Sequence, residues 1–179
     1  MKTHSIIIAL LGSALLFMAG CATPTQPSAM KVDSVSLTKK FNKSVAVQTN
    51  GGQPTDPMWA SRVSDADLAT AISDSLSSTG LFSSVVTIGQ ADYVLNATLV
   101  KIDQPMMGFT MSVGVEIVWS VVPKAQKKTV WERLVSTRQE KTVGDAFAGV
   151  TRLRMATEAA VKENIRQALM QLSEAPLPE

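Results

Sequence analysis

Alternation of apolar and polar side chains predicts five β-strands along this chain. The longest alternation runs from Phe109 to Val121, where every second residue is apolar and the residues between are mostly polar or small. A period of two places one face of a strand in the core and leaves the other toward water. Shorter patterns predict the other four strands, at residues 44–49, 84–88, 93–103 and 129–141.

A spacing of four residues between apolar side chains predicts a first amphipathic helix. Leu68, Ile72 and Leu76 lie four positions apart, so they stack on one helical face. Ser64 precedes this pattern and is expected to cap the N-terminus of the helix. Gly80 follows the pattern and is expected to end the helix.

A second amphipathic helix is predicted from Thr151, as its N-cap, to about residue 172. Its apolar stripe consists of Val161, Ile165, Ala168, Leu169 and Leu172. The element order is then strand, helix, strand, an antiparallel meander, and helix. Because two amphipathic helices need a common apolar surface, we expect an α+β fold. We expect a two-layer sandwich with a mostly antiparallel sheet and both helices packed on one face.

Composition places the chain among ordinary globular proteins. It has 179 residues, of which 45% are apolar and 18% charged, enough for one domain with a sizeable core. It has one cysteine, which excludes a small disulfide-stabilised fold. The formal net charge is only +2, whereas a nucleic-acid-binding protein usually has a larger basic excess.

The N-terminus has the features of a secretory signal peptide. Lys2 makes the leader positive, and the apolar run from Ile6 to Met18 is too short to span a bilayer comfortably. The string Met18-Ala19-Gly20-Cys21 resembles the lipobox of bacterial lipoprotein precursors. The resemblance implies cleavage between Gly20 and Cys21, with a diacylglyceryl thioether on the Cys21 sulfur and an acyl group on the new amino terminus. The other interpretation is an ordinary signal peptide with an incidental cysteine.

The lipobox resemblance also implies a location. Such lipoproteins stay in the inner membrane when Asp follows the cysteine, but here Ala22 follows it. We therefore expect a lipid anchor in the outer membrane, with the protein facing the periplasm. A polar, proline-containing stretch after Cys21 is typical of a tether. The predicted organisation is a signal peptide at 1–20, a lipidated cysteine with a flexible tether at 21–42, a periplasmic α+β domain at 43–173 and a disordered tail at 174–179.

The mature chain lacks the side chains that many catalytic and metal sites need. The single histidine, His4, lies in the predicted signal peptide, and the single cysteine is expected to carry lipid. This excludes Ser-His-Asp and Cys-His catalysis and zinc sites made of cysteine and histidine. Asp65 and Asp67 lie where a helix begins, which favours capping and dipole roles over catalysis. We expect no enzymatic activity, no metal site and no cofactor.

The segment from Asp67 to Leu95 resembles a group of small periplasmic lipoproteins. In that group a helix ends in a Ser-x-Gly-x-Phe clasp, and an Ala-Asp-Tyr step starts the next strand. The corresponding residues here are Ser78-Thr79-Gly80-Leu81-Phe82 and Ala91-Asp92-Tyr93. The group includes the lipopolysaccharide-assembly lipoprotein, auxiliary lipoproteins of lipid-transport ABC systems, the curli-secretion lipoprotein and the penicillin-binding-protein activators. The resemblance implies a non-catalytic accessory protein that binds an envelope assembly or transport component, as a monomer or in a hetero-complex.

The connection from Gln104 to Phe109 is apolar where a turn between strands is usually polar. Exposed apolar side chains at a turn favour a contact surface, and methionines adapt to different shapes. Met106, Met107 and Phe109 are therefore candidate contacts for an envelope protein or a glycolipid. Two alternatives stay open. The loop folds back into the core, or it forms the mouth of an apolar cavity in a lipid or glycolipid carrier.

Two arginines are the remaining candidate contacts. Arg152 and Arg154 fall in the first turn of the predicted final helix, where the helix dipole disfavours positive charge. An anionic partner would explain their position. The alternative is that both are solvated and pair with Asp145 or Glu158.

Overall fold

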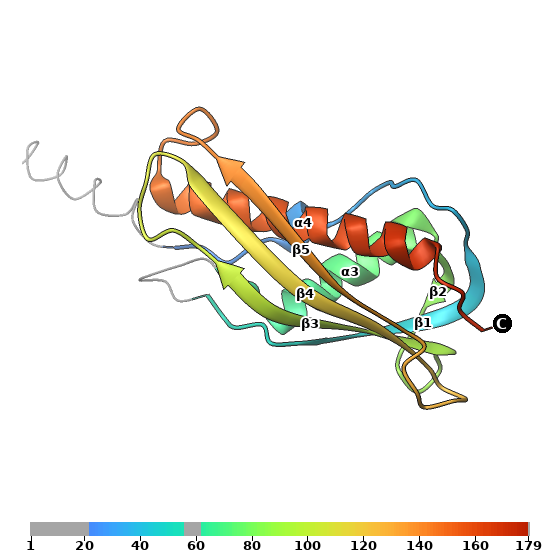
Figure 1. The fold of residues 1–179 in the computed structure, drawn as a ribbon. Helices are drawn as coiled ribbons and strands as arrows, with labels where there is room; N and C mark the ends of the chain where they lie inside the picture. The colour runs from blue at the N-terminus through green and yellow to red at the C-terminus, as the bar shows by residue number, and fades with distance from the viewer. Residues whose placement is uncertain (1–21, 56–61, 179) are drawn as a thin grey trace, which may run out of the picture.

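A computed structural model describes residues 22–55 and 62–178 of the chain (Figure 1). The α+β class is confirmed, and the five predicted strands and two predicted helices are all present. In chain order the elements are α2 (Pro27–Met30), β1 (Phe41–Asn50), α3 (Asp65–Thr79), β2 (Phe82–Val85), β3 (Tyr93–Asp103), β4 (Met111–Pro123), β5 (Trp131–Lys141) and α4 (Gly149–Ser173).

The sheet is mixed, so the prediction of a mostly antiparallel sheet is not confirmed. The strand order is β2-β1-β3-β4-β5. Strand β1 runs parallel to both of its neighbours, whereas the pairs β3–β4 and β4–β5 are antiparallel. The parallel pair β1–β2 follows from the connection, because α3 carries the chain back along the sheet before β2 begins. Val45 pairs with Val85 of β2 on one side and with Tyr93 of β3 on the other. Strand β1 therefore lies between β2 and β3, and the connection from β2 to β3 crosses β1.

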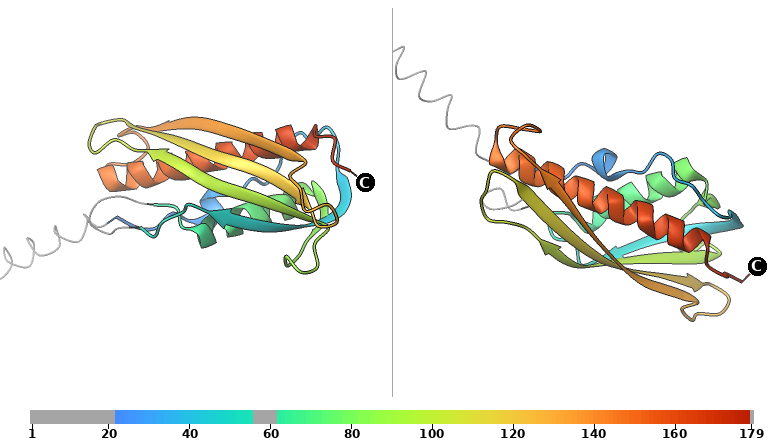
Figure 2. Two further views of the ribbon diagram at one scale, coloured as in Figure 1. Left: turned by 60° about the horizontal axis from the view of Figure 1, so that its bottom comes forward. Right: turned by 45° about the horizontal axis from the view of Figure 1, so that its top comes forward.

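Helices α3 and α4 lie on the same side of the sheet (Figure 2). Helix α3 packs on β1 and β2, and α4 packs on β4 and β5. Every second residue of β4 from Met111 to Pro123 is buried, as the alternation predicts. The predicted apolar stripes of both helices also belong to the core. They are Leu68, Ile72 and Leu76 in α3, and Val161, Ile165, Ala168, Leu169 and Leu172 in α4.

Both predicted ends of α3 are confirmed. The Ser64 hydroxyl accepts a hydrogen bond from the backbone N–H of Asp67, and the Asp65 carboxylate accepts one from the N–H of Gly52. The Ser64 hydroxyl in turn donates to the Asp67 carboxylate, so Ser64 and Asp67 cap the helix together, while Asp65 connects the helix start to the loop after β1. Gly80 ends the helix with φ +63°, a left-handed conformation in which glycine avoids the strain of a Cβ atom.

Helix α4 begins earlier than predicted. Its first helical residue is Gly149 and its N-cap is Ala148, which makes no side-chain capping bond. Thr151 therefore lies inside the first turn and is not the cap. The helix start is secured from its own first turn, because the Arg152 side chain donates to the carbonyls of Ala146 and Phe147 in the loop that precedes it.

The segment predicted to be a flexible tether is folded from residue 22 onward. Short helix α2 packs against α3 and α4. The side chain of Met30 is fully buried and that of Val32 is 2% exposed, and the N–H of Val32 donates to the Ser75 hydroxyl at 2.9 Å. Two apolar residues in a polar stretch make no periodic pattern, but they fill the space between two helices.

The predicted disordered tail is also packed where the structure describes it, at 174–178. Ala175 and Leu177 are buried in the main core cluster. The hydroxyl of Tyr93 donates a hydrogen bond to the carbonyl of Pro178. The folded domain therefore extends from 22 to 178, beyond the predicted limits of 43 and 173 at both ends.

Candidate functional site

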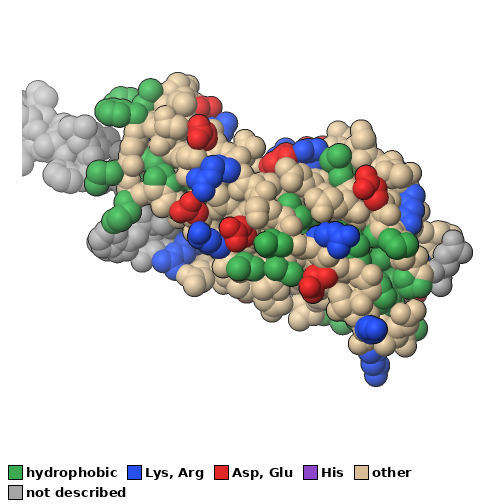
Figure 3. All heavy atoms as spheres, in the orientation of Figure 1, with side chains coloured by type: hydrophobic (Ala, Val, Ile, Leu, Met, Phe, Trp, Pro, Cys, Tyr) green, Lys and Arg blue, Asp and Glu red, His purple; other side chains and the backbone are tan. Residues whose placement is uncertain are grey.

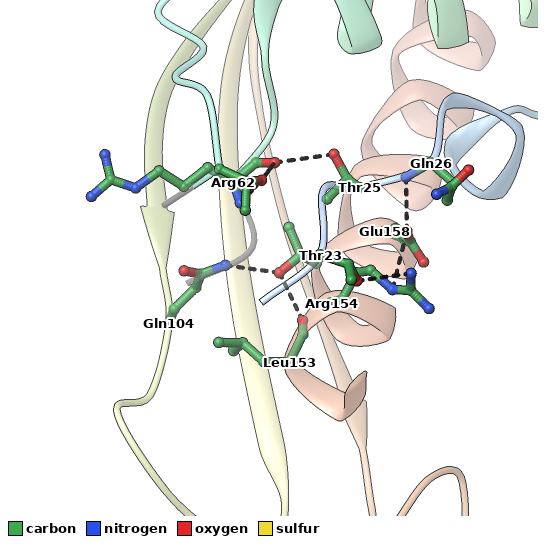
Figure 4. Close-up of polar contacts among 10 residues, drawn as sticks. Thr23, Thr25, Gln26, Arg62, Gln104, Leu153, Arg154 and Glu158 are labelled. Atoms are coloured by element: carbon green, nitrogen blue, oxygen red, sulfur yellow. Dashed lines mark hydrogen bonds and ion pairs between the residues drawn. The ribbon is translucent and has the colours of Figure 1, made fainter. Parts of the chain in front are cut away.

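The described chain begins firmly attached to α4 (Figure 4). Arg154 donates a hydrogen bond of 3.0 Å to the Thr23 hydroxyl, and the backbone N–H of Gln26 donates one of 2.8 Å to the Glu158 carboxylate. The Thr25 hydroxyl donates to the carbonyl of Arg62. Ala22 is only 7% exposed. The position of residue 22 is therefore set by the domain.

Glu158 is the buried carboxylate of this junction. It is 6% exposed, and the Nε atom of Arg154 lies 3.8 Å from its Oε1. Burial raises the pKa of Glu158 above its ordinary value, although the N–H of Gln26 and the charge of Arg154 favour the ionised form. The junction thus places an acidic group in an environment that disfavours its charge.

Four large apolar side chains project from two loops at the same end of the domain. Met106, Met107 and Phe109 belong to the β3–β4 loop and are 90%, 83% and 84% exposed, and Phe147 in the β5–α4 loop is 96% exposed. We name these four residues the apolar tip. Figure 3 shows exposed hydrophobic side chains at one end of the domain. The alternative that the β3–β4 loop folds back into the core is therefore wrong.

Arg152 holds the two loops of the apolar tip together. It is 5% exposed, and it donates to the carbonyls of Ala146 and Phe147 in one loop and of Gly108 in the other. A guanidinium has donors in several directions, so one side chain satisfies carbonyls from both loops. Arg152 is consequently not a contact residue for an anionic partner, and it is not a solvated arginine paired with Asp145 or Glu158.

Arg154 pairs with an acidic side chain, as in the alternative to an anionic partner. It forms an ion pair with Glu158 and also bonds to Thr23. Its charge is engaged in attaching the N-terminal segment to α4. The two candidate arginines therefore differ, since Arg152 connects loops and Arg154 connects the chain start to the helix.

The exposure of the β3–β4 loop argues against its role as a cavity mouth. Side chains that are more than four-fifths exposed do not wall an enclosed cavity. One hollow, with a volume of about 320 Å³, lies between β3 and the segment after β1. Its lining, which mixes polar and apolar groups, is Gly51, Gln53, Arg62, Val63, Leu99, Val100, Lys101, Ile102 and Gln104.

Sequence reasoning missed the second loop of the apolar tip. Phe147, and also Val143 at 53% exposure, lie in the β5–α4 loop, which is not among the contacts predicted from the sequence. Their signal was the same as that of Met106 and Phe109, namely a large apolar residue inside a turn. The two loops lie side by side because Arg152 bonds to carbonyls of both. The sequence contains no pattern that predicts these bonds.

The predicted lipidation site Cys21 and cleavage site Gly20–Cys21 lie outside the described residues. Across 22–55 and 62–178, no helix has the length and apolar character that a membrane span requires. The same ranges contain no group of three or more histidine, cysteine or acidic side chains placed to hold a metal ion.

Comparison by sequence yields no relative: no family model matches the chain, and no curated protein does. Comparison of structures does yield similar folds. Protein XCC0632 from Xanthomonas campestris, of the family DUF330, is 12% identical with a TM-score of 0.61, and the match covers 85% of this chain and 95% of that one.

Two further solved structures share the fold. The hypothetical protein CT253 from Chlamydia trachomatis is 10% identical with a TM-score of 0.54, covering 75% of this chain and 97% of that one. A minor lipoprotein from Acinetobacter baumannii is 13% identical with a TM-score of 0.50, covering 78% and 100%. At such low identity these matches establish a shared fold, and that is the extent of what they establish.

Proposed function

We propose that this chain is a lipid-anchored accessory protein of the bacterial envelope that binds an assembly or transport component and catalyses no reaction. One junction carries the proposal. The lipobox-like string Met18-Ala19-Gly20-Cys21 is followed directly by residues buried on the domain, since Ala22 is 7% and Thr25 2% exposed. Stable anchoring of a protein in a membrane needs two or more acyl chains. The diacylglyceryl and N-acyl groups expected on Cys21 would meet this requirement.

The proposed location is the periplasmic face of the outer membrane, because Ala22 and not Asp follows Cys21. The fold shared with the Acinetobacter baumannii minor lipoprotein supports a lipoprotein, as its name identifies it as one. The proposed partner is an envelope protein or a glycolipid, as implied by the resemblance of the α3–β3 segment to periplasmic accessory lipoproteins.

The absence of catalysis is supported by the roles that polar side chains already have. Asp65 accepts the N–H of Gly52, Arg152 donates to three carbonyls, and Glu158 accepts the N–H of Gln26. The chain has one histidine, His4, in the segment that cleavage would remove. Acid–base chemistry near neutral pH most often uses histidine.

Metabolic labelling with radioactive palmitate tests the anchor. We expect label in the wild type and none in Cys21→Ser, which should remain an uncleaved precursor. In fractionated membranes, Ala22→Asp should keep the label and move to the inner membrane. Ala22→Ser, of similar size, should stay in the outer membrane. Label persisting in Cys21→Ser, or mass spectrometry showing residues 1–20 on the native protein, would overturn the proposal.

A further inference from the structure

We infer that the apolar tip inserts into the lipid surface to which the chain is anchored, so that the domain is docked on the bilayer at a defined end. This inference rests on the proposed lipid anchor and adds a second membrane contact to it. The four tip side chains, Met106, Met107, Phe109 and Phe147, are between 83% and 96% exposed. Monomeric soluble proteins rarely display such apolar groups together unless the surface is used.

The two loops are held as one surface. Arg152 donates to the carbonyl of Phe147 and, at 3.1 Å, to the carbonyl of Gly108, the residue before Phe109. The backbones that carry the two phenylalanines are therefore joined through one buried side chain. Their side chains are exposed to solvent instead of packed in the core, so the arrangement presents apolar groups from two connected loops.

The anchor starts at this same end of the molecule. Thr23 bonds to Arg154, which lies two residues from Arg152 on α4. An α-helix rises about 1.5 Å per residue, so the Cα atoms of the two arginines are about 3 Å apart along the axis, although residues two apart face different sides of the helix. The chain start and the loops are therefore both attached at the first turns of α4. Cys21 is the residue before Ala22, and consecutive Cα atoms are about 3.8 Å apart. Acyl chains on Cys21 would therefore begin at the same end of the domain as the apolar tip.

The charges around the loops suit a shallow insertion. Arg138 pairs with Asp103 at 2.7 Å, and Lys141 pairs with Asp145 at 3.3 Å, both at the ends of the strands from which the loops emerge. These pairs form a polar collar behind the apolar tip. Such a collar fits the headgroup region, while apolar and aromatic side chains beyond it fit the boundary with the acyl chains.

A protein partner could cover the same residues, but the position of the anchor favours lipid. A protein that is held by acyl chains one residue from a folded domain keeps that end next to the bilayer at all times. Four large apolar groups at that end lie close to the bilayer, and moving them from water into lipid is favourable. Binding strength at an interface scales with buried apolar area, so tip and anchor reinforce each other.

Depth-dependent quenching tests the inference on the lipidated protein purified from membranes. Met107→Cys and Phe147→Cys are labelled with a small environment-sensitive fluorophore and reconstituted in phosphatidylethanolamine–phosphatidylglycerol vesicles that contain spin-labelled acyl chains. We expect the emission at both positions to fall by about twofold or more. Ile88→Cys is the control, because Ile88 is 53% exposed and lies before the start of β3, about 33 Å along the strand from the tip.

A second set of variants separates insertion from chance proximity. Phe109→Ser and Phe147→Ser, carrying the fluorophore at position 107, should lose most of the quenching. Leu134→Ser, which removes an exposed apolar residue of β5 away from the tip, should retain it. Exposed positions contribute little to folding, so thermal melts of all three variants should match the wild type.

The outcomes distinguish this inference from the proposed function. The wild type contains a single cysteine, Cys21, and the proposed diacylglyceryl thioether would leave it without a free thiol. If the wild type takes up the fluorophore, the anchor itself fails. If the wild type is unlabelled and stays with the vesicles, but positions 107 and 147 are quenched no more than position 88, the apolar tip does not enter lipid and the inference is wrong while the anchor stands.

Discussion

The indole Nε1 of Trp119 in β4 donates a hydrogen bond of 2.9 Å to the side-chain oxygen of Asn164 in α4, and both residues are fully buried. The amide nitrogen of Asn164 also donates to the carbonyl of Val135 at 2.8 Å. One asparagine therefore connects a helix to two strands. Buried polar groups are stable only when paired, so this contact fixes the position of α4 on the sheet.

Replacing Asn164 should destabilise the domain strongly. Asn164→Ala leaves the Trp119 N–H and the Val135 carbonyl without this partner, and we expect a loss of about 3 kcal/mol in the free energy of unfolding. Urea denaturation measures it. Asn96→Ala is the control, because Asn96 is half-buried and bonds to Ser120 at 3.4 Å, and it should cost less than about 1 kcal/mol. Equal losses in the two variants would contradict the role given to Asn164.

The segment before β1 should behave as part of the core. Met30 is fully buried, so Met30→Ala is expected to lower the free energy of unfolding by about 2–5 kcal/mol. Met106→Ala makes the same chemical change at a residue that is 90% exposed, and it should change stability by less than about 0.5 kcal/mol. Thermal or urea unfolding compares the two. A mild effect of Met30→Ala would mean that residues 22–32 are a tether after all.

Glu158 should weaken the fold as it ionises. Its pKa is raised by burial, so its contribution is fully present below the ordinary value of 4.5 and is lost as the pH rises through the raised value. Glu158→Gln cannot ionise and keeps an oxygen for the N–H of Gln26. The stability of Glu158→Gln relative to the wild type should therefore improve from about pH 4 to about pH 7 in urea denaturation.

Glu163 on the same helix supplies a control of opposite sign. Its pKa is lowered chiefly by hydrogen bonding from Arg166, so its contribution is present above the ordinary value and is lost as the pH falls. Glu163→Gln should thus be most harmful near neutral pH, and the difference from the wild type should shrink on acidification. Identical pH trends for the two variants would refute the assignment of Glu158.

Arg152 and Arg154 should be separable by local exchange measurements. Arg152→Met removes the bonds to Gly108, Ala146 and Phe147, and we expect faster hydrogen–deuterium exchange in both tip loops with a stability loss of about 2–3 kcal/mol. Arg154→Met should instead accelerate exchange in residues 22–26, because it removes the bond to Thr23. If both variants loosen the same segment, the two arginines do not have distinct roles.

Local patterns in the chain predict most of the elements. The helix from Asp65 to Thr79 follows from the capping serine, the four-residue apolar spacing and Gly80, all of which act within one or two turns. Strand β3 has the predicted bounds, and β4 differs by two residues at each end. These features depend on backbone and side-chain preferences of neighbouring residues, which the chain order alone contains.

The candidate site was only partly predictable. The apolar character of Met106, Met107 and Phe109 suggested a contact surface, and their exposure agrees with that suggestion. Phe147 is not among the predicted contacts, although a large apolar residue inside a turn is the same signal as that of Met106 and Phe109. The two arginines are candidates because of their position on the helix. The environment of each, however, depends on a distant segment. Arg152 bonds to Gly108, more than forty residues away in sequence, and Arg154 bonds to Thr23, more than a hundred residues away.

What the sequence by itself determined is the five strands and the two long helices, the α+β class and the chemistry that the chain lacks, because periodicity, capping and residue inventory are local or additive properties. Only the tertiary structure decided the parallel pairing of β1, the folding of residues 22–32 onto the helices, and the meeting of two apolar loops beside the start of the domain. These features arise from contacts between distant segments, whose free energy depends on shape and on hydrogen-bond partners that no local pattern records.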